Sequence, residues 1–366
     1  MTRASRPARM VERLGDQGNP VRVAVVGYGL GGSAFHAPLI SVTPGLSLDA
    51  VVTANPDRQA AARSRYPDAS VVATVDDLMA RAADFDLAVV TVPNAAHVDV
   101  AAAALRAGLH VVVDKPVAPS AREVLELARI ARDVDRRMIP YHNRRWDGDF
   151  RTIRALISRG DLGQVWRVES RFERWVPRPI RSGTWKQDPA LPAAGVLYDL
   201  GVHLIDQALV LFGPPTSVYA EVAARRGGSE DDAFVALGYG SGPVVQLWAS
   251  TCAAQVGPRF RVLGSEGAYV KYGLDVQEAA LRAGRLPTEP EWGEEPSSAW
   301  GLLGTIDDAQ PLPTLPGAYQ DFYAAAAACL LEGGEQPVAV ADAAVVIRII
   351  EAAHRSAAEE AITGLD

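Results

Sequence analysis

Two polar residues in the second half of the sequence have the types and the spacing of an acid–base pair. Asp199 and His203 are four positions apart in a segment with a helical pattern, so on an α-helix they would share one face. A carboxylate at that distance can hold an imidazole in one tautomer, and histidine titrates near neutral pH, as a base for alcohol oxidation should. His203 is therefore a candidate base with Asp199 as its partner. Asp206 is the alternative partner, and an ordinary helix-surface pair is the alternative interpretation.

A glycine-rich turn near the start of the chain could hold phosphate groups. Gly27-Tyr28-Gly29-Leu30-Gly31-Gly32 fits the pattern G-x-G-x-x-G, and it follows an apolar strand pattern and precedes a helical one. In such a turn Gly27 allows a tight bend, Gly29 lets the backbone approach a pyrophosphate, and Gly32 lets helix and strand pack closely. We expect a bound dinucleotide whose contacts include Gly27, Tyr28, Gly29, Leu30 and Gly32.

The end of the second predicted strand bears on the choice between NAD and NADP. An acidic residue there would bond the adenosine ribose and repel a 2′-phosphate. This chain has Thr53 at that place, followed by Asn55 and Arg58, and the guanidinium could attract the phosphate. The sequence favours NADP over NAD, with Thr53, Asn55 and Arg58 among the cofactor contacts. The alternative is that Arg58 is only a solvated residue at a helix start.

Strands and helices alternate at short intervals in the first part of the chain, which predicts a doubly wound α/β domain with a parallel sheet over residues 21–140. The sequence predicts a flexible tail over residues 1–20. The predicted strands are 21–27, 46–54, 85–93 and 110–116, and the predicted helices are 32–42, 57–66, 75–82, 97–107 and 120–136, the last of these capped by Ser120.

Beyond residue 141 the pattern changes to strands that alternate apolar and polar residues and follow one another directly. A second domain over residues 141–366 is therefore expected, of the α+β class, with a large open and mostly antiparallel sheet. Its predicted elements are a helix over 149–159, strands over 165–175, 216–224, 233–239, 243–250, 259–264 and 268–272 with the last two as a hairpin, an irregular loop over 286–316, and helices over 318–332 and 341–360.

Two further motifs give the sequence a family resemblance. Asp114-Lys115-Pro116 follows a predicted strand, and the segment from Gly195 to His203 contains the acid–base pair. With the glycine turn they closely resemble the Gfo/Idh/MocA oxidoreductases, and the segments 27–40, 141–150 and 198–213 look most like the scyllo-inositol dehydrogenase branch. The family's usual Glu-Lys-Pro is Asp-Lys-Pro here. The resemblance implies a Rossmann domain joined to an open-sheet domain, and an NAD(P)-dependent enzyme acting on a secondary alcohol or ketone of a cyclitol or sugar.

The resemblance also implies roles for individual residues. His203 would be the catalytic base with Lys115 and Asp199 assisting, and Pro93 and Asn94 would contact the nicotinamide ribose. His97 would lie nearby, with helix capping as its alternative role, and Asp114 and Lys115 would complete the cofactor contacts. The expected substrate contacts are His142, Asn143, Arg144, Trp185 and His203.

Composition limits the partners that the chain can have. It has 366 residues, 48% of them hydrophobic and 22% charged, and a formal charge of −8, which gives no reason to expect nucleic acid or an anionic membrane as a partner. Two cysteines and the absence of a secretory signal indicate the cytoplasm, and no zinc-type spacing is present, so we expect no metal. The family resemblance implies a homodimer or homotetramer that associates through the second sheet.

Three other functions are compatible with these motifs. The chain could be a sugar dehydrogenase or ketoreductase of secondary metabolism, or a non-catalytic NAD(P)-binding regulator that has lost turnover. It could also cleave glycosides by transient oxidation on the same scaffold. Intact Lys115, Asp199 and His203 argue against the regulator.

Overall fold

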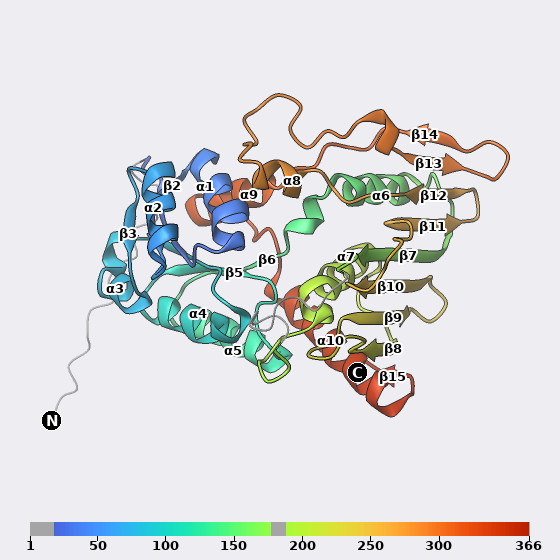
Figure 1. The fold of residues 1–366 in the computed structure, drawn as a ribbon, viewed down its shortest axis with the longest axis horizontal. Coiled ribbons are helices and arrows are strands. Elements are labelled where there is room, and N and C mark those ends of the chain that lie inside the picture. Colours follow the sequence, from blue (N-terminus) through green and yellow to red (C-terminus); the bar gives the residue numbers. More distant parts are fainter. Residues whose placement is uncertain (1–17, 177–187, 366) are drawn as a thin grey trace.

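The computed structural model describes residues 18–176 and 188–365. Most of the predicted tail, the predicted substrate residue Trp185 and its neighbour Lys186 therefore lie outside the described residues. Two sheets stand side by side, one built from the first part of the chain and the other from the second (Figure 1). This arrangement confirms the predicted fold class.

The first sheet has six parallel strands in the order β3-β2-β1-β4-β5-β6. The strands are β1 (Val21–Val26), β2 (Leu46–Val52), β3 (Ser70–Val72), β4 (Leu87–Val90), β5 (His110–Asp114) and β6 (Met138–Tyr141). The helices are α1 (Ala37–Val42), α2 (Pro56–Arg65), α3 (Val75–Ala80), α4 (His97–Arg106) and α5 (Ala121–Asp133). The short strands β3 and β6 were not among the predicted elements, because three or four residues are too few to show a period.

Alternate residues of β1 show why helices cover both faces of this sheet. Ala24 and Val26 belong to a core shared with α4 and α5, whereas Val23 and Val25 belong to a core shared with α1. All four side chains are fully buried, as expected for a parallel strand that is covered on both sides. The predicted cap also forms, since the Ser120 side chain accepts a hydrogen bond from the Glu123 N–H.

The second sheet has nine strands in the order β14-β13-β12-β11-β7-β10-β9-β8-β15, and β7 with β10 is its parallel pair. Its first six strands along the chain are β7 (Val165–Glu173), β8 (Ser217–Ala223), β9 (Asp232–Gly238), β10 (Val244–Ser250), β11 (Phe260–Gly264) and β12 (Ala268–Lys271). The predicted hairpin between β11 and β12 is confirmed. Helices α6 (Gly148–Arg159), α7 (Val202–Phe212) and α10 (Val340–Glu359) bury apolar side chains in one core with this sheet.

The predicted loop over residues 286–316 is wrong in part. It contains β13 (Gly301–Gly304) and β14 (Gln310–Leu312), and β13 pairs with β12 so that the sheet is extended at its edge. These strands are short and rich in glycine and proline, so the sequence pattern does not show them. The two-residue strand β15 (Thr363–Gly364) closes the other edge against β8.

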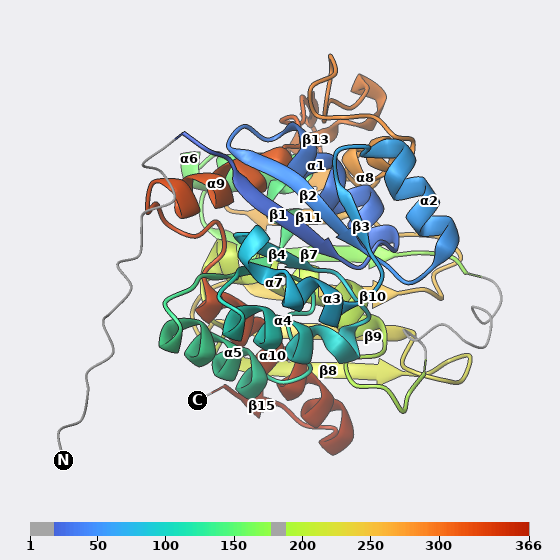
Figure 2. The ribbon, with the colours of Figure 1, turned by 90° about the vertical axis from the view of Figure 1, so that its left-hand side faces the viewer.

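Helices from the end of the chain return to the first part. α9 (Gln320–Leu331) places Phe322, Tyr323 and Ala326 in the core on one face of the first sheet, next to α1. α10 packs against both α5 and β8, and Figure 2 shows α10 beside α5. The short helix α8 (Gln277–Arg282) also adds a buried Leu281 to the core with α9. Within the described ranges, no helix is long and apolar enough to cross a membrane.

Candidate active site

A cavity of about 690 Å³ runs from the glycine turn into the second part of the chain. Its walls come from the carboxyl ends of the strands of the first sheet and from β7, α7 and α8, so residues far apart in sequence meet there. The predicted site residues that line it are Gly27, Tyr28, Gly29, Leu30, Thr53, Arg58, Pro93, Asn94, His97, Asp114, Lys115, Asn143, Arg144, Asp199 and His203. Gly32, Asn55 and His142 are not among the lining residues.

The three motif glycines differ in what a side chain would meet. A Cβ on Gly27, whose φ is +103°, would lie 2.5 Å from the Thr91 carbonyl oxygen, and one on Gly32 would lie 2.1 Å from the Gly27 carbonyl oxygen. Both glycines are therefore needed for the turn itself to pack. A Cβ on Gly29 would meet only the end of the Arg58 side chain, at 3.9 Å. The space over Gly29 is thus free on the cavity side, which fits the close approach of a pyrophosphate to this backbone.

At the adenosine end of the cavity, Thr53 and Arg58 are lining residues and Asn55 is not. The Asn55 side-chain oxygen accepts a hydrogen bond of 3.0 Å from the Arg58 N–H, which caps α2. Asn55 therefore positions the start of the helix that carries Arg58. Thr74, which follows β3, also lines this end and was not among the predicted contacts.

The expected hydrogen bond between Asp199 and His203 is replaced by an ion pair. Lys115 Nζ donates to Asp199 Oδ1 at 2.9 Å and to the Asp199 carbonyl at 2.6 Å. His203 Nδ1 has no hydrogen-bond partner among the described residues. The reason is local: Leu197–Gly201 form a π-helical turn before α7 begins, so a spacing of four residues no longer aligns two side chains. Asp206 is not the partner either, because it binds Arg145 at 2.7 and 2.9 Å.

The surroundings of His203 keep its imidazole neutral. His203 is only 5% exposed. Its burial, together with the charges of Lys115 and Arg144, holds the pKa of His203 well below its usual value. A neutral imidazole is the form that accepts a proton, but the lowered pKa makes His203 a weaker base than the near-neutral titration expected from the sequence. Asp114, in contrast, stays ionised: burial alone would raise its pKa, but the contact with His36 at 3.4 Å and the charge of Lys115 lower it to about 2.

Arg144 brings a guanidinium to the far end of the cavity. Its Nη2 donates to Glu278 at 2.7 Å and its Nη1 to Asp147 at 3.3 Å, while the guanidinium lies 4.6 Å above the Phe172 ring. Three further residues line the cavity but were not predicted. Phe172 lies on β7, Arg174 directly follows β7, and Glu278 lies on the short helix α8. None of them stands in a recognisable sequence motif. His142 is buried outside the cavity, with Nδ1 3.9 Å from Asp206.

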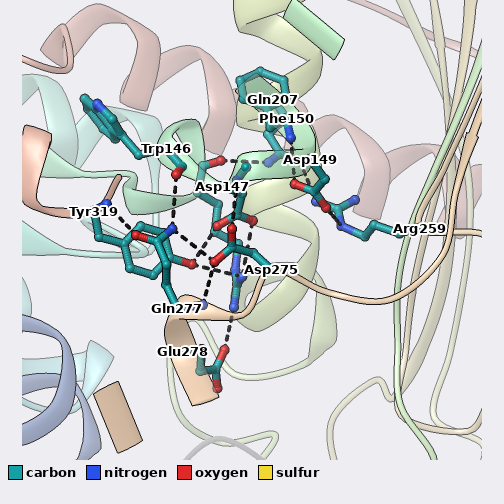
Figure 3. A network of polar contacts seen from close by, with 12 residues as sticks. Trp146, Asp147, Asp149, Phe150, Gln207, Arg259, Asp275, Gln277, Glu278 and Tyr319 are labelled. Atoms are coloured by element: carbon teal, nitrogen blue, oxygen red, sulfur yellow. Dashed lines mark hydrogen bonds and ion pairs between the residues drawn. The ribbon is translucent and has the colours of Figure 1, made fainter. Parts of the chain in front are cut away.

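The residues around Asp147, Asp275 and Tyr319 form a buried polar network (Figure 3), and Arg144 is hydrogen-bonded to it. Tyr319 donates to Asp147 at 2.6 Å, and Gln207 donates to the Arg144 carbonyl at 2.9 Å. Burial raises the pKa of Asp147 to about 8 and that of Asp275 to about 6, and the charge of Arg144 opposes the rise at Asp147. The Arg144 guanidinium is therefore held by hydrogen bonds to Asp147, Tyr319 and Glu278.

Asn94 and His97 tie together the chain segments that surround the part of the cavity where the cofactor is expected. Asn94 Nδ2 donates to the Ala193 carbonyl at 2.9 Å, which ties the loop after β4 to the second part of the chain. His97 is the first residue of α4 and does not cap it; its ring contacts two backbone carbonyls instead. Among the described residues, no group of three His, Cys, Asp or Glu side chains could hold a metal ion.

Comparisons with known proteins decide the family. Residues 21–142 match the family described as "Oxidoreductase family, NAD-binding Rossmann fold", and residues 150–270 match the GFO/IDH/MocA C-terminal domain. The chain belongs to the Gfo/Idh/MocA oxidoreductases. The predicted resemblance is thereby confirmed, and with it an NAD-binding Rossmann domain.

Individual relatives cover most of the chain. It is 37% identical to the scyllo-inositol 2-dehydrogenase (NADP(+)) IolW of Bacillus subtilis over 93% of this chain and 94% of that protein. It is 29% identical to the D-glucoside 3-dehydrogenase of Escherichia coli over 54% of this chain and 55% of that protein. The solved structure of the Bacillus subtilis protein YvaA, a candidate oxidoreductase, has a TM-score of 0.89 at 34% identity, and covers 96% of this chain and 99% of its own.

Proposed function

We propose that this oxidoreductase interconverts a secondary alcohol and a ketone on a cyclitol or sugar, with NAD(P) as the cofactor. One observation carries the proposal: a single cavity joins the open backbone at Gly29 to the Lys115–Asp199 pair and to His203. The glycine turn would hold the pyrophosphate, and Pro93 and Asn94 would lie against the nicotinamide ribose. The cofactor, when bound, accepts or supplies the hydride.

His203 and Lys115 would then carry out the proton transfer that accompanies the hydride transfer. In the oxidative direction the substrate hydroxyl must lose a proton, and neutral His203 can accept it. Lys115, oriented by Asp199, can donate a hydrogen bond to the same substrate oxygen. In the reductive direction the protonated imidazole returns the proton to the oxygen. Arg144 and Glu278 offer a donor and an acceptor side by side at 2.7 Å, an arrangement that suits neighbouring hydroxyl groups.

We further propose that NADP is preferred to NAD. Among the described residues, no carboxylate lines the cavity where the adenosine ribose would lie, and Arg58 lines it there together with Thr53. The relative IolW is named as NADP-dependent. Dissociation constants for NADPH and NADH, measured by their fluorescence, test this preference directly, and equal constants would contradict it.

Turnover at 340 nm with inositols, aldoses and sugar ketones, each with NADP and with NAD, tests the main proposal. Lys115→Ala and His203→Ala should each lose at least about a hundredfold in kcat while still binding NADPH. His354→Ala, on helix α10 and not among the residues that line the cavity, is the matched control and should behave as the wild type. Full turnover by either site variant removes that residue from the reaction.

A sugar as the substrate is the second candidate within the same chemistry, and the relative that oxidises a D-glucoside favours it. Turnover of a glucoside with no turnover of any inositol would decide for it. Fluorescence quenching by NADPH binding without turnover on the whole panel would instead favour a non-catalytic regulator.

We also propose that a second copy of the chain covers the open face of the nine-stranded sheet. The Phe234 and Trp248 rings are in tilted contact there, with 5.1 Å between their centroids, Arg171 lies 3.9 Å above Trp248, and Leu302 is 46% exposed. These residues alternate with the buried ones that face the helices, so they share the uncovered face. Light scattering should give a dimer or tetramer for the wild type and a monomer for Trp248→Glu.

We also propose a reducing, cytoplasmic location for the protein. The free thiols of Cys252 and Cys329 support this proposal.

A further inference from the structure

His97 is one of the residues that line the cavity, and its ring contacts two backbone segments at once. His97 is only 1% exposed. Nδ1 lies 2.8 Å from the Pro116 carbonyl oxygen, and Nε2 lies 2.8 Å from the Val92 carbonyl oxygen. Pro116 directly follows Lys115, and Val92 directly precedes Pro93 and Asn94. The imidazole thus bridges the two loops that leave β4 and β5 toward the cavity.

The chemistry of the two contacts sets a condition on the ring. A carbonyl oxygen can only accept, and a neutral imidazole has one N–H, so both contacts are hydrogen bonds only when the ring is protonated on both nitrogens. Burial lowers the pKa of His97, while the ionised Asp114 and the two carbonyls oppose this effect and Lys115 adds to it. The bridge is therefore complete at acid pH and loses one of its two bonds as the pH rises.

Lys115 is held between this bridge and the second part of the chain. On one side its Nζ donates to the carboxylate and carbonyl of Asp199. On the other side the next residue in the chain is tied to His97 through its carbonyl. Without the imidazole, the loop after β5 would keep the Asp199 contact but would lose its link to the loop after β4.

We propose that His97 is a positioning residue that fixes Lys115 relative to the cofactor-binding loop after β4, and that it does so most strongly at low pH. The inference rests on the proposed function for the role of Lys115 in turnover. It goes beyond that function in assigning a task to a side chain that has no part in the proposed proton transfer.

Acylation of lysine tests the position of Lys115 without any substrate. The chain has only three lysines, Lys115, Lys186 and Lys271, so trace labelling with acetic anhydride followed by mass spectrometry resolves each of them. Buried Lys271, paired with Glu295 at 3.1 Å, is the internal reference. Because one backbone hydrogen bond is lost, labelling of Lys115 in His97→Ala should rise about 2- to 10-fold. His97→Gln, which keeps one donor, should rise less, and His354→Gln should not change.

The pH dependence separates positioning from simple filling of space. The ratio of Lys115 labelling in His97→Ala to that in the wild type should be largest at acid pH and should fall as the imidazole loses its second proton. A ratio that stays at one in folded His97→Ala overturns the proposal, and so does a raised ratio that is constant with pH. If the labelling result holds but no alcohol is oxidised, the proposed function fails and the positioning of Lys115 stands.

Discussion

Replacing Gly29 by alanine separates folding of the turn from binding of the dinucleotide. The added Cβ would meet only the flexible end of Arg58, at 3.9 Å, and Gly29 does not have a positive φ. The free energy of unfolding should therefore change by less than about 1 kcal/mol. The methyl group would occupy the space that a pyrophosphate needs, and the loss of one hydrogen bond to a charged phosphate costs about 2 kcal/mol. The dissociation constant for NADPH should rise about 30-fold.

Two measurements on the same samples test this reasoning. Calorimetry should place the Tm of Gly29→Ala within about 3 °C of the wild type, and NADPH fluorescence should show the weaker binding. Gly32→Ala is the contrasting variant, because its Cβ would lie 2.1 Å from a backbone oxygen and the helix would have to move. It should lose about 1–3 kcal/mol of stability as well as binding. Unchanged NADPH affinity in Gly29→Ala would refute the seating of the dinucleotide on this turn.

Three further predictions concern charged groups. Arg58→Ala should weaken NADP binding about tenfold and leave NAD binding unchanged, with Arg63→Ala on the same helix as the control; equal losses for both cofactors would contradict the 2′-phosphate contact. Asp199→Asn should lower kcat at least about tenfold with an unchanged dissociation constant for NADPH, because Lys115 loses its ionic partner, and a normal kcat would argue against the pair. The raised pKa of Asp147 means that the folded state keeps a proton that the unfolded state releases, so stability falls as the pH rises from about 4 to about 8. Asp147→Asn should remove this contribution to the loss of stability. The Tm of the variant should therefore rise relative to the Tm of the wild type as the pH increases up to about 8.

The sequence was sufficient for the parts of the site that depend on local chain geometry. Gly27, Gly29 and Gly32 have the surroundings that their spacing predicts, because a turn between a strand and a helix is set by neighbouring residues. Asp199 and His203 show the limit of such reasoning. Their predicted pairing assumed a regular α-helix. The segment instead forms a π-helical turn, which has no signature in the sequence, and Asp199 pairs with Lys115.

Other parts of the site depend on contacts between distant segments. Glu278 reaches the cavity because α8 packs against residues 31–36, where the glycine turn ends, and the sequence around Glu278 has no motif that would predict this contact. His97 could be placed near the cofactor from its position after Pro93, but its two carbonyl partners are 5 and 19 residues away and only the fold brings them together. Asn55 belongs to the site only indirectly, through the cap of α2.

The return of α9 to the first sheet has a consequence for how the protein is made. Phe322, Tyr323 and Ala326 complete one layer of a core whose other members begin at Val21, so that layer is open until nearly the whole chain has left the ribosome. The nucleotide-binding half is thus not a finished unit when its last strand emerges. A fragment ending after β6 would expose the apolar side of its own sheet, and heat should melt the two halves of the intact protein in one transition.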